Sequence, residues 1–178
     1  MWLDARARRR DNARMDAPVL PLDQETFGPD NACFGCGPRN PIGLRLAFTR
    51  EGDAVVTRFT PAPIHQGPPG IFHGGLQTAL ADDLAAWTII GLRGRMGFTS
   101  SMSVRFVRPV RVGVEVVGRG RIVDEVGRLL TVKTVLEQNG RAAYTARIVY
   151  ALPDRRTAEK ILDGPLPDRW GRFTGEEE

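Results

Sequence analysis

The sequence predicts an α+β domain in which an antiparallel sheet of about five or six strands wraps around one long central helix. Apolar and polar residues alternate with period two over most of residues 19–153, which is the pattern of strands with one covered face. Only residues 74–91 space their apolar side chains by three and four, as a helix does. The turns between the alternating stretches are short, so sequential strands are expected to pair antiparallel.

Two strands are expected before the helix. Residues 44–49 and 55–59 each alternate apolar with polar side chains, and Glu51-Gly52-Asp53 lies between them. A polar, glycine-containing turn between two such stretches is typical of a hairpin.

About four strands are expected after the helix. The first covers residues 101–106 and ends before Pro109, because proline cannot donate a hydrogen bond to a neighbouring strand. The next begins at Val112 and runs to a polar turn that ends at Gly127. Residues 130–136 continue the alternation, and Asn139-Gly140 supplies the positive φ angles of a type I′ hairpin before a last strand over residues 142–152.

The helical stretch has two different faces. Its large apolar residues fall within one sector, which we expect to pack on the sheet of the same chain: Leu76, Ala79, Leu80, Leu84, Trp87 and Ile90. A second face carries small residues and is left for a partner: Thr78, Ala81, Asp82 and Ala85.

The chain length of 178 residues suits one domain with tails. Residues 1–18 hold five arginines and three aspartates without an apolar pattern, so we expect a flexible N-terminal arm. Residues 19–153 form the predicted domain, and residues 154–178 a peripheral C-terminal tail. Because no stretch approaches the roughly 18 apolar residues of a membrane span and the N-terminus lacks a signal-peptide core, we expect a cytoplasmic protein without a membrane partner.

The net charge of +4 raises the question of nucleic-acid binding. Of 25 basic residues only Lys133 and Lys160 are lysines, and the arginines are spread along the whole chain. The sequence contains no helix-turn-helix, zinc-finger or aromatic RNA-binding signature. We therefore expect no nucleic-acid partner; a mildly basic domain is equally compatible with a phosphorylated small ligand.

The two cysteines, Cys33 and Cys36, and the two histidines, His65 and His73, make a formal Cys₂His₂ set. Zinc fingers space their histidines by three to five residues within one helix, whereas Pro68, Pro69 and Gly70 interrupt the segment here. The residues after Cys36 are turn formers, which disfavours a redox pair. We expect two reduced cysteines in a loop and no metal site.

The junction before the helix carries the candidate chemistry. Gly74 and Gly75 open the helix, where free N–H groups without neighbouring Cβ atoms can bind a ligand oxygen closely. Asp82 lies two turns further along, on the small-residue face, where a carboxylate could attack a carbonyl carbon or activate water. A capped helix with a solvated aspartate accounts for these residues equally well.

Residues 73–82, His-Gly-Gly-Leu-Gln-Thr-Ala-Leu-Ala-Asp, preceded by Gly-Pro-Pro-Gly-Ile at 67–71, resemble the signature of hotdog-fold acyl-CoA thioesterases of the PaaI-like group, in the 4-hydroxybenzoyl-CoA thioesterase superfamily. Residues 99–110 resemble the family's strand after the helix, and residues 33–44 the entry segment of a subgroup. The resemblance covers roughly residues 31–153. It implies a hotdog fold and hydrolysis of an acyl-CoA thioester to free acid and CoA, with no further cofactor.

The resemblance also implies roles for individual residues. Asp82 matches the catalytic carboxylate, which acts as nucleophile or general base. Gly75 and its neighbour Gly74 match the helix start whose amide polarises the thioester carbonyl. Thr99 matches a hydroxyl residue that places the water or the carboxylate, and His73 matches a histidine that gives a supporting hydrogen bond. Because the family's sites form between subunits, a homodimer is the minimum unit, and a dimer of dimers is common.

The substrate-binding residues are less directly matched. Several family members have Asn or Gln six residues before the motif histidine, where this chain has Gly67, so His65 or Gln66 is expected to substitute. Arg105, Arg108 and Arg111 surround Pro109, and guanidinium groups suit the phosphates of coenzyme A; solvated strand-edge charges are as good an account of each.

Three ambiguities stay open at this stage. Asp83 falls in the large apolar sector of the helix, and a modest rotation would exchange it with Asp82. A hotdog hydratase or dehydratase ranks lower than a thioesterase, because such enzymes carry an acid about one turn into the helix, where this chain has Ala79 and Leu80. A non-catalytic acyl-CoA binding domain is the third alternative.

Overall fold

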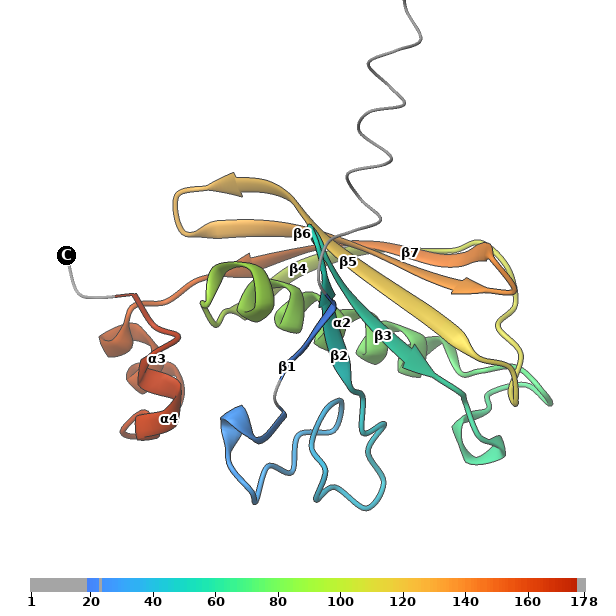
Figure 1. Cartoon of the computed structure of the whole chain (residues 1–178), viewed down its shortest axis with the longest axis horizontal. Helices are drawn as coiled ribbons and strands as arrows, with labels where there is room; N and C mark the ends of the chain where they lie inside the picture. The colour runs from blue at the N-terminus through green and yellow to red at the C-terminus, as the bar shows by residue number, and fades with distance from the viewer. Residues whose placement is uncertain (1–18, 23, 176–178) are drawn as a thin grey trace, which may run out of the picture.

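The computed structural model describes residues 19–22 and 24–175. Seven antiparallel strands form one sheet in the order β1-β2-β3-β5-β6-β7-β4, and the long helix α2 runs across one face of it (Figure 1). The strands are β1 (Val19–Leu22), β2 (Phe48–Glu51), β3 (Ala54–Phe59), β4 (Phe98–Phe106), β5 (Val116–Val126), β6 (Leu129–Gln138) and β7 (Arg141–Ala151). The helices are α2 (Gly74–Arg93), α3 (Arg155–Ile161) and α4 (Asp168–Gly171), with 3₁₀ turns η1 (Gln24–Phe27) and η2 (Pro63–His65). This is the predicted α+β architecture of a sheet around one helix.

Helix α2 begins at a capped end and stops at a glycine. The His73 side chain caps the N-terminus, and Gly94, with φ of 62°, ends the helix in the left-handed conformation. Its apolar face packs mainly on β3, β5 and β6. Leu80 and Leu84 are fully buried there, as predicted for the large apolar face.

Two glycines in β5 let α2 approach the sheet closely. A Cβ atom on Gly120 would lie 2.1 Å from the Oγ1 of Thr88, and one on Gly118 would lie 2.9 Å from a methyl group of Leu84. Since real Cβ contacts are longer than 3 Å, glycine at these positions sets the distance between helix and sheet.

The predicted turns agree with the structure, but several strand boundaries do not. The strand expected over residues 44–49 is β2, which covers only Phe48–Glu51. Asn139 and Gly140 have φ of 53° and 70°, as the type I′ hairpin between β6 and β7 requires. The strand expected to begin at Val112 begins at Val116, because the chain first turns at Gly113 (φ 80°), whose amide bonds to Pro61. Strand β1 was not predicted, since four residues that include Pro21 show no clear alternation.

The C-terminal residues 154–175 form a small helical unit at one end of the molecule (Figure 1). Ala158, Leu166 and Phe173 are buried in a second apolar cluster with Met96, against which Phe27 packs. The segment therefore has a core contact of its own at the end of α2. The predicted arm, residues 1–18, and residues 176–178 lie outside the described residues.

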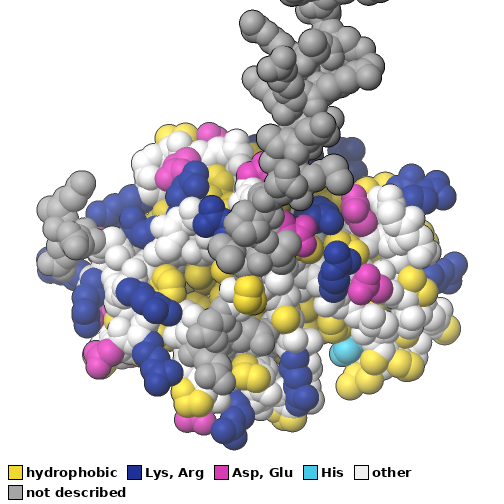
Figure 2. Space-filling view, viewed as in Figure 1, with side chains coloured by type: hydrophobic (Ala, Val, Ile, Leu, Met, Phe, Trp, Pro, Cys, Tyr) yellow, Lys and Arg dark blue, Asp and Glu magenta, His cyan; other side chains and the backbone are white. Residues whose placement is uncertain are grey.

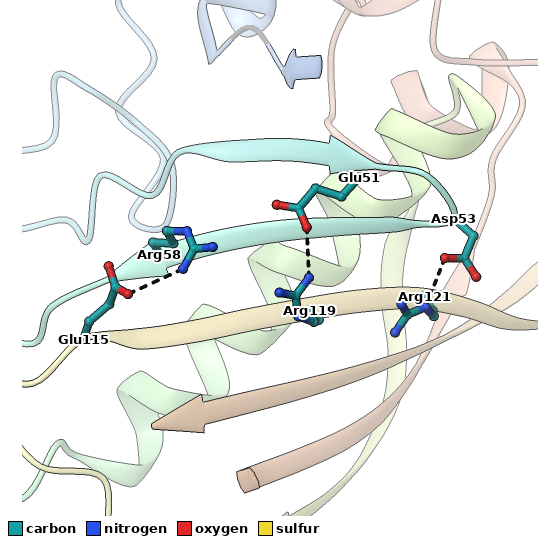
Figure 3. A network of polar contacts seen from close by, with 6 residues as sticks. All are labelled: Glu51, Asp53, Arg58, Glu115, Arg119 and Arg121. Atoms are coloured by element: carbon teal, nitrogen blue, oxygen red, sulfur yellow. Dashed lines mark hydrogen bonds and ion pairs between the residues drawn. The ribbon is translucent and has the colours of Figure 1, made fainter. Parts of the chain in front are cut away.

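The face of the sheet away from α2 is polar over β2, β3 and β5. Three ion pairs cross these strands, with nitrogen–oxygen distances of 3.0 to 3.5 Å: Arg119–Glu51, Arg121–Asp53 and Arg58–Glu115 (Figure 3). Their side chains are substantially exposed, so each contributes at most about 1 kcal/mol. In the view of Figure 2, basic side chains are spread in small groups among acidic ones rather than gathered into one patch.

Candidate active site

Asp82 is held at the edge of the sheet by two hydroxyl groups. Its carboxylate Oδ1 accepts hydrogen bonds from the Oγ1 of Thr99 at 2.6 Å and from the hydroxyl of Tyr150 at 2.7 Å. Thr99 and Tyr150 are cross-strand partners in β4 and β7. Among the described residues the other oxygen, Oδ2, has no hydrogen-bond donor, so it is the oxygen available for chemistry.

Tyr150 is the site residue that the sequence did not reveal. It is buried, and burial together with the Asp82 charge raises the pKa of its hydroxyl above the ordinary value. The group therefore stays a hydrogen-bond donor at neutral pH. The sequence placed Tyr150 correctly on a covered strand face, but only the pairing of β7 with β4 shows that it meets Asp82.

Asp83 faces a different part of the molecule. Its Oδ1 lies 3.7 Å from the Sγ of Cys33, in the turn before β2. The adjacent aspartates thus have separate environments: Asp82 lies beside β4 and β7, and Asp83 beside the Cys33 turn. Helical phase alone could not separate them, because neighbours on a helix differ by only about 100°.

The helix start differs from the sequence-based expectation at one amide. The Gly75 N–H is not free: it donates to the Nδ1 of His73 at 3.0 Å. The glycines leave room for the His73 imidazole to fold back over the first turn of the helix. The ring lies so close to Gly67 and Gly75 that a Cβ on either residue would be 3.1 Å from a ring atom. The Gly74 N–H has no acceptor among the described residues.

His65 and Gln66 are both bound within their own loop. The Nδ1 of His65 accepts from the amide of Ala62 at 2.9 Å, and the Oε1 of Gln66 accepts from the amide of Gly70 at 3.1 Å. These bonds shape the loop that leads to α2. Within the described residues, neither side chain contacts Asp82.

The three arginines near Pro109 have different contacts. Arg105 lines a hollow of ≈ 290 Å³ with Lys133 and Arg147. Arg108 binds the carbonyl of Ala142, and the main chain of Arg111 is held by the side chain of Gln138. Arg105 lies within β4, whereas Arg108 and Arg111 follow the strand.

Strand β4 is an uncovered edge that carries apolar side chains. Met102, Val104 and Phe106 are 37%, 39% and 54% exposed, and Phe106 stacks edge-on against the buried Tyr144. Because alternate residues share a face, all three lie on the helix side of the sheet. An edge strand with free backbone groups and an apolar face is open to pairing with another chain.

The distance along α2 separates the two halves of the candidate site. Asp82 follows Gly74 by eight positions, which at a rise of 1.5 Å per residue is about 12 Å along the helix. A carbonyl bound at the helix start is therefore out of reach of Asp82 in the same chain. The two groups could act on one carbonyl only if a second chain supplied one of them.

The fold, an antiparallel sheet wrapped around one central helix, is the hotdog fold of solved thioesterase structures. Residues 69–142, somewhat less than half of the chain, match the model of the thioesterase superfamily. This match and the architecture confirm the resemblance predicted from the His-Gly-Gly segment. No curated protein matches the chain.

Several solved structures share the fold at low sequence identity. A protein described as a thioesterase superfamily protein aligns over 83% of this chain and 75% of its own, with 21% identity and a TM-score of 0.64. A putative thioesterase from Ralstonia eutropha, described as phenylacetic acid degradation-related, aligns over 61% and 85%, with 22% identity and a TM-score of 0.55. A hypothetical thioesterase from Streptococcus pneumoniae with coenzyme A aligns over 56% and 81%, with 19% identity and a TM-score of 0.54.

No helix among the described residues combines the length and apolar character that crossing a bilayer requires.

Proposed function

We propose that the protein hydrolyses an acyl-CoA thioester, with Asp82 as nucleophile or general base. The observation that carries the proposal is the Asp82 carboxylate, which is fixed through one oxygen by Thr99 and Tyr150 and leaves the other oxygen without a donor. A carboxylate held in this way keeps its orientation while its second oxygen receives a proton or forms a bond. The superfamily match and the related structure with bound coenzyme A support this substrate class.

The chemistry balances along either route. As a base, Asp82 accepts a proton from water while the water oxygen bonds to the acyl carbon. The carbon–sulfur bond then breaks, and the proton passes from Asp82 to the CoA thiolate or to solvent, which restores the carboxylate. As a nucleophile, Asp82 Oδ2 bonds to the acyl carbon, CoA leaves as a thiolate, and water hydrolyses the resulting anhydride. In both routes the products are the free acid and CoA.

We assign the carbonyl oxygen to the start of α2. The Gly74 N–H is the available donor there, and the positive end of the helix dipole adds to it. The Gly75 N–H becomes a second donor only when the carbonyl displaces the His73 imidazole from it. His73 thus holds the amide in place before substrate binds, which is a positioning role.

The site is completed, in this proposal, by a second copy of the chain. The apolar face of β4 adjoins Thr99, which binds Asp82 directly, so an edge-to-edge dimer would bring the partner's helix start toward Asp82. A homodimer is the smallest active unit, and a dimer of dimers is compatible with it. Arg105, Arg108 and Arg111 are candidates for contacts with CoA phosphates.

The test is a thiol-release assay across aliphatic and aromatic CoA esters with the wild type, Asp82→Asn and the matched control Asp124→Asn. Asp124 is an exposed acid on β5, far from this constellation in the sheet order. We expect Asp82→Asn to lower kcat by about 10²- to 10⁴-fold, the usual range for a lost catalytic base, and the control to match the wild type.

Full activity in Asp82→Asn would remove Asp82 from the mechanism. Saturable binding of CoA esters by the wild type without thiol release would favour the non-catalytic binding domain. Turnover of an enoyl-CoA by water addition, again without thiol release, would favour the hydratase alternative.

A further inference from the structure

The structure brings together three side chains that the proposed thioesterase chemistry does not use. Cys33 and Cys36 lie in the turn before β2, and Asp83 lies in the middle of α2. One ligand atom from each residue lies within 4.8 Å of the other two, and the Cys33 Sγ is 3.7 Å from the Asp83 Oδ1. In the described part of the chain no other three His, Cys, Asp or Glu residues cluster in this way, and neither histidine joins the group.

These separations are close to those of a tetrahedral metal site. With bonds of about 2.3 Å to sulfur and about 2.0 Å to oxygen, tetrahedral angles keep ligand atoms roughly 3.5 to 3.8 Å apart. Small side-chain rotations in the turn are therefore sufficient to bring all three donors to one ion.

The turn itself is tight. The Gly37 amide donates to the Cys33 carbonyl at 2.9 Å, and a Cβ on Gly37 would lie 2.4 Å from the Cys33 nitrogen, so only glycine closes the turn this tightly. Cys33 is exposed and Cys36 is buried, so one thiol faces solvent and the other faces the interior beside Asp83. A thiol that binds a metal does so as a thiolate, with loss of its proton.

The third group carries an unpartnered buried atom. The Oδ2 of Asp83 is buried and makes no hydrogen bond with the described residues. A Cβ on Gly35 would lie 2.4 Å from the Asp83 carboxyl carbon, so the turn packs directly on the acid. Buried polar atoms are normally partnered, so a ligand bound beside the two cysteines would account for this oxygen.

We propose that Cys33, Cys36 and Asp83 bind a divalent metal ion of the zinc class, with water as the fourth ligand. Two thiolates and one carboxylate are donors that such an ion prefers. Hydrogen bonds from the Leu44 and Leu46 amides, at 2.8 and 2.9 Å, already join the cysteine turn to the segment before β2. The ion would add a second link, from this turn to the middle of α2. A disulfide between the two cysteines would leave the buried, unpaired carboxylate of Asp83 unexplained, so we favour the metal.

The proposed site differs from the zinc finger considered in the sequence, because its third ligand would be a carboxylate 50 residues from Cys33 and not a histidine. The sequence signal for such a site is Asp83 on the predicted apolar face of α2.

The test is a titration of the reduced, chelator-treated full-length protein with Co²⁺, followed by displacement with Zn²⁺. We expect one ion per chain, a sulfur-to-cobalt charge-transfer absorption, release of protons on binding, and a higher thermal unfolding midpoint with Zn²⁺. Cys33→Ser and Asp83→Asn should each weaken binding by about tenfold or more. Cys33 is exposed, so its substitution is the safer variant for folding.

Asp82→Asn is the matched control for Asp83→Asn. It removes the neighbouring carboxylate on the same helix, and we expect it to retain Co²⁺ binding while losing thioester turnover, so the two proposals fail separately. Absence of Co²⁺ binding by the reduced wild type would overturn the metal site. Unchanged affinity in the Cys33→Ser/Cys36→Ser double variant would also overturn it, as would isolation of a Cys33–Cys36 disulfide that binds no Co²⁺ after reduction.

Discussion

Replacing Tyr150 with phenylalanine removes one hydroxyl group and leaves the ring in place. That hydroxyl lies 2.7 Å from both the Oδ1 and the main-chain oxygen of Asp82, and the residue is 2% exposed. A hydrogen bond to a charged group contributes about 1.5 to 3 kcal/mol, and Thr99 still holds the same oxygen. If the less firmly oriented carboxylate raises the activation free energy by about 1.4 kcal/mol, kcat falls about tenfold.

The same strand supplies the matched control. Tyr144 is also buried on the helix side of β7, but its hydroxyl contacts the Oγ1 of Thr78 at 3.2 Å instead of Asp82. Tyr144→Phe should therefore cost about 0.5 to 1.5 kcal/mol of stability, as a neutral hydrogen bond does, and leave kcat nearly unchanged.

The assay combines urea unfolding at fixed protein concentration with kcat and KM for the best CoA ester. Because Thr99 and Tyr150 hold one oxygen, we expect the Thr99→Val/Tyr150→Phe double variant to lose more kcat than the product of the single effects. Equal kcat in Tyr150→Phe and Tyr144→Phe would refute the positioning role. A strictly multiplicative double variant would show that the two hydroxyls act independently.

Three further predictions follow from other contacts. Gly120→Ala should destabilise the protein by about 1 to 3 kcal/mol, because its Cβ would lie 2.1 Å from the Thr88 Oγ1. Urea unfolding should show that adding Thr88→Ala relieves most of this cost. If the stability losses of the two substitutions simply add in the double variant, the proposed clash is wrong. If the proposed β4 dimer forms, Val104→Lys should shift it toward monomer in sedimentation experiments and lower thioester turnover. Val126, 66% exposed on the β5–β6 hairpin, gives the control Val126→Lys, which should change neither. An unchanged oligomer in Val104→Lys would contradict an interface at β4. Hydrogen bonds from Thr157, followed by the contact with Arg128, lower the pKa of Asp154 to about 2. The stabilising effect of Asp154 is therefore complete above its ordinary pKa of 3.8 and is lost as pH falls toward about 2. The difference in thermal midpoint between wild type and Asp154→Asn should shrink over that range, and a constant difference would exclude the linkage.

Local patterns in the sequence were enough to predict most of the fold. The three-and-four spacing of residues 74–91 predicted α2, and Asn139-Gly140 predicted the hairpin between β6 and β7, because these signals depend only on nearby residues. The start of β5 was predicted wrongly at Val112, and β1 was not predicted, for the same reason. The start of β5 depends on the turn at Gly113, which is held by a residue on another segment, and β1 depends on pairing with β2.

The candidate site was predicted only in part. Asp82 was singled out from its place on the helix and from the resemblance to a family motif, and Thr99 and His73 from the resemblance alone. The structure gives Asp82 and Thr99 a direct hydrogen bond. The Gly75 amide was expected to be free and is bound by His73 instead. A glycine pair indicates open space at a helix start, but it does not indicate which neighbouring side chain fills that space.

The sequence by itself determined the elements, the covered faces and the chemical groups available, since hydrophobic period, turn residues and side-chain types are local properties. Only the tertiary structure decided which groups meet. Cross-strand pairing brought Tyr150 to Asp82, and packing of the entry turn on α2 brought Cys33 and Cys36 to Asp83. Such contacts join residues about 50 to 70 positions apart, and they depend on strand order and helix rotation, which no local pattern encodes.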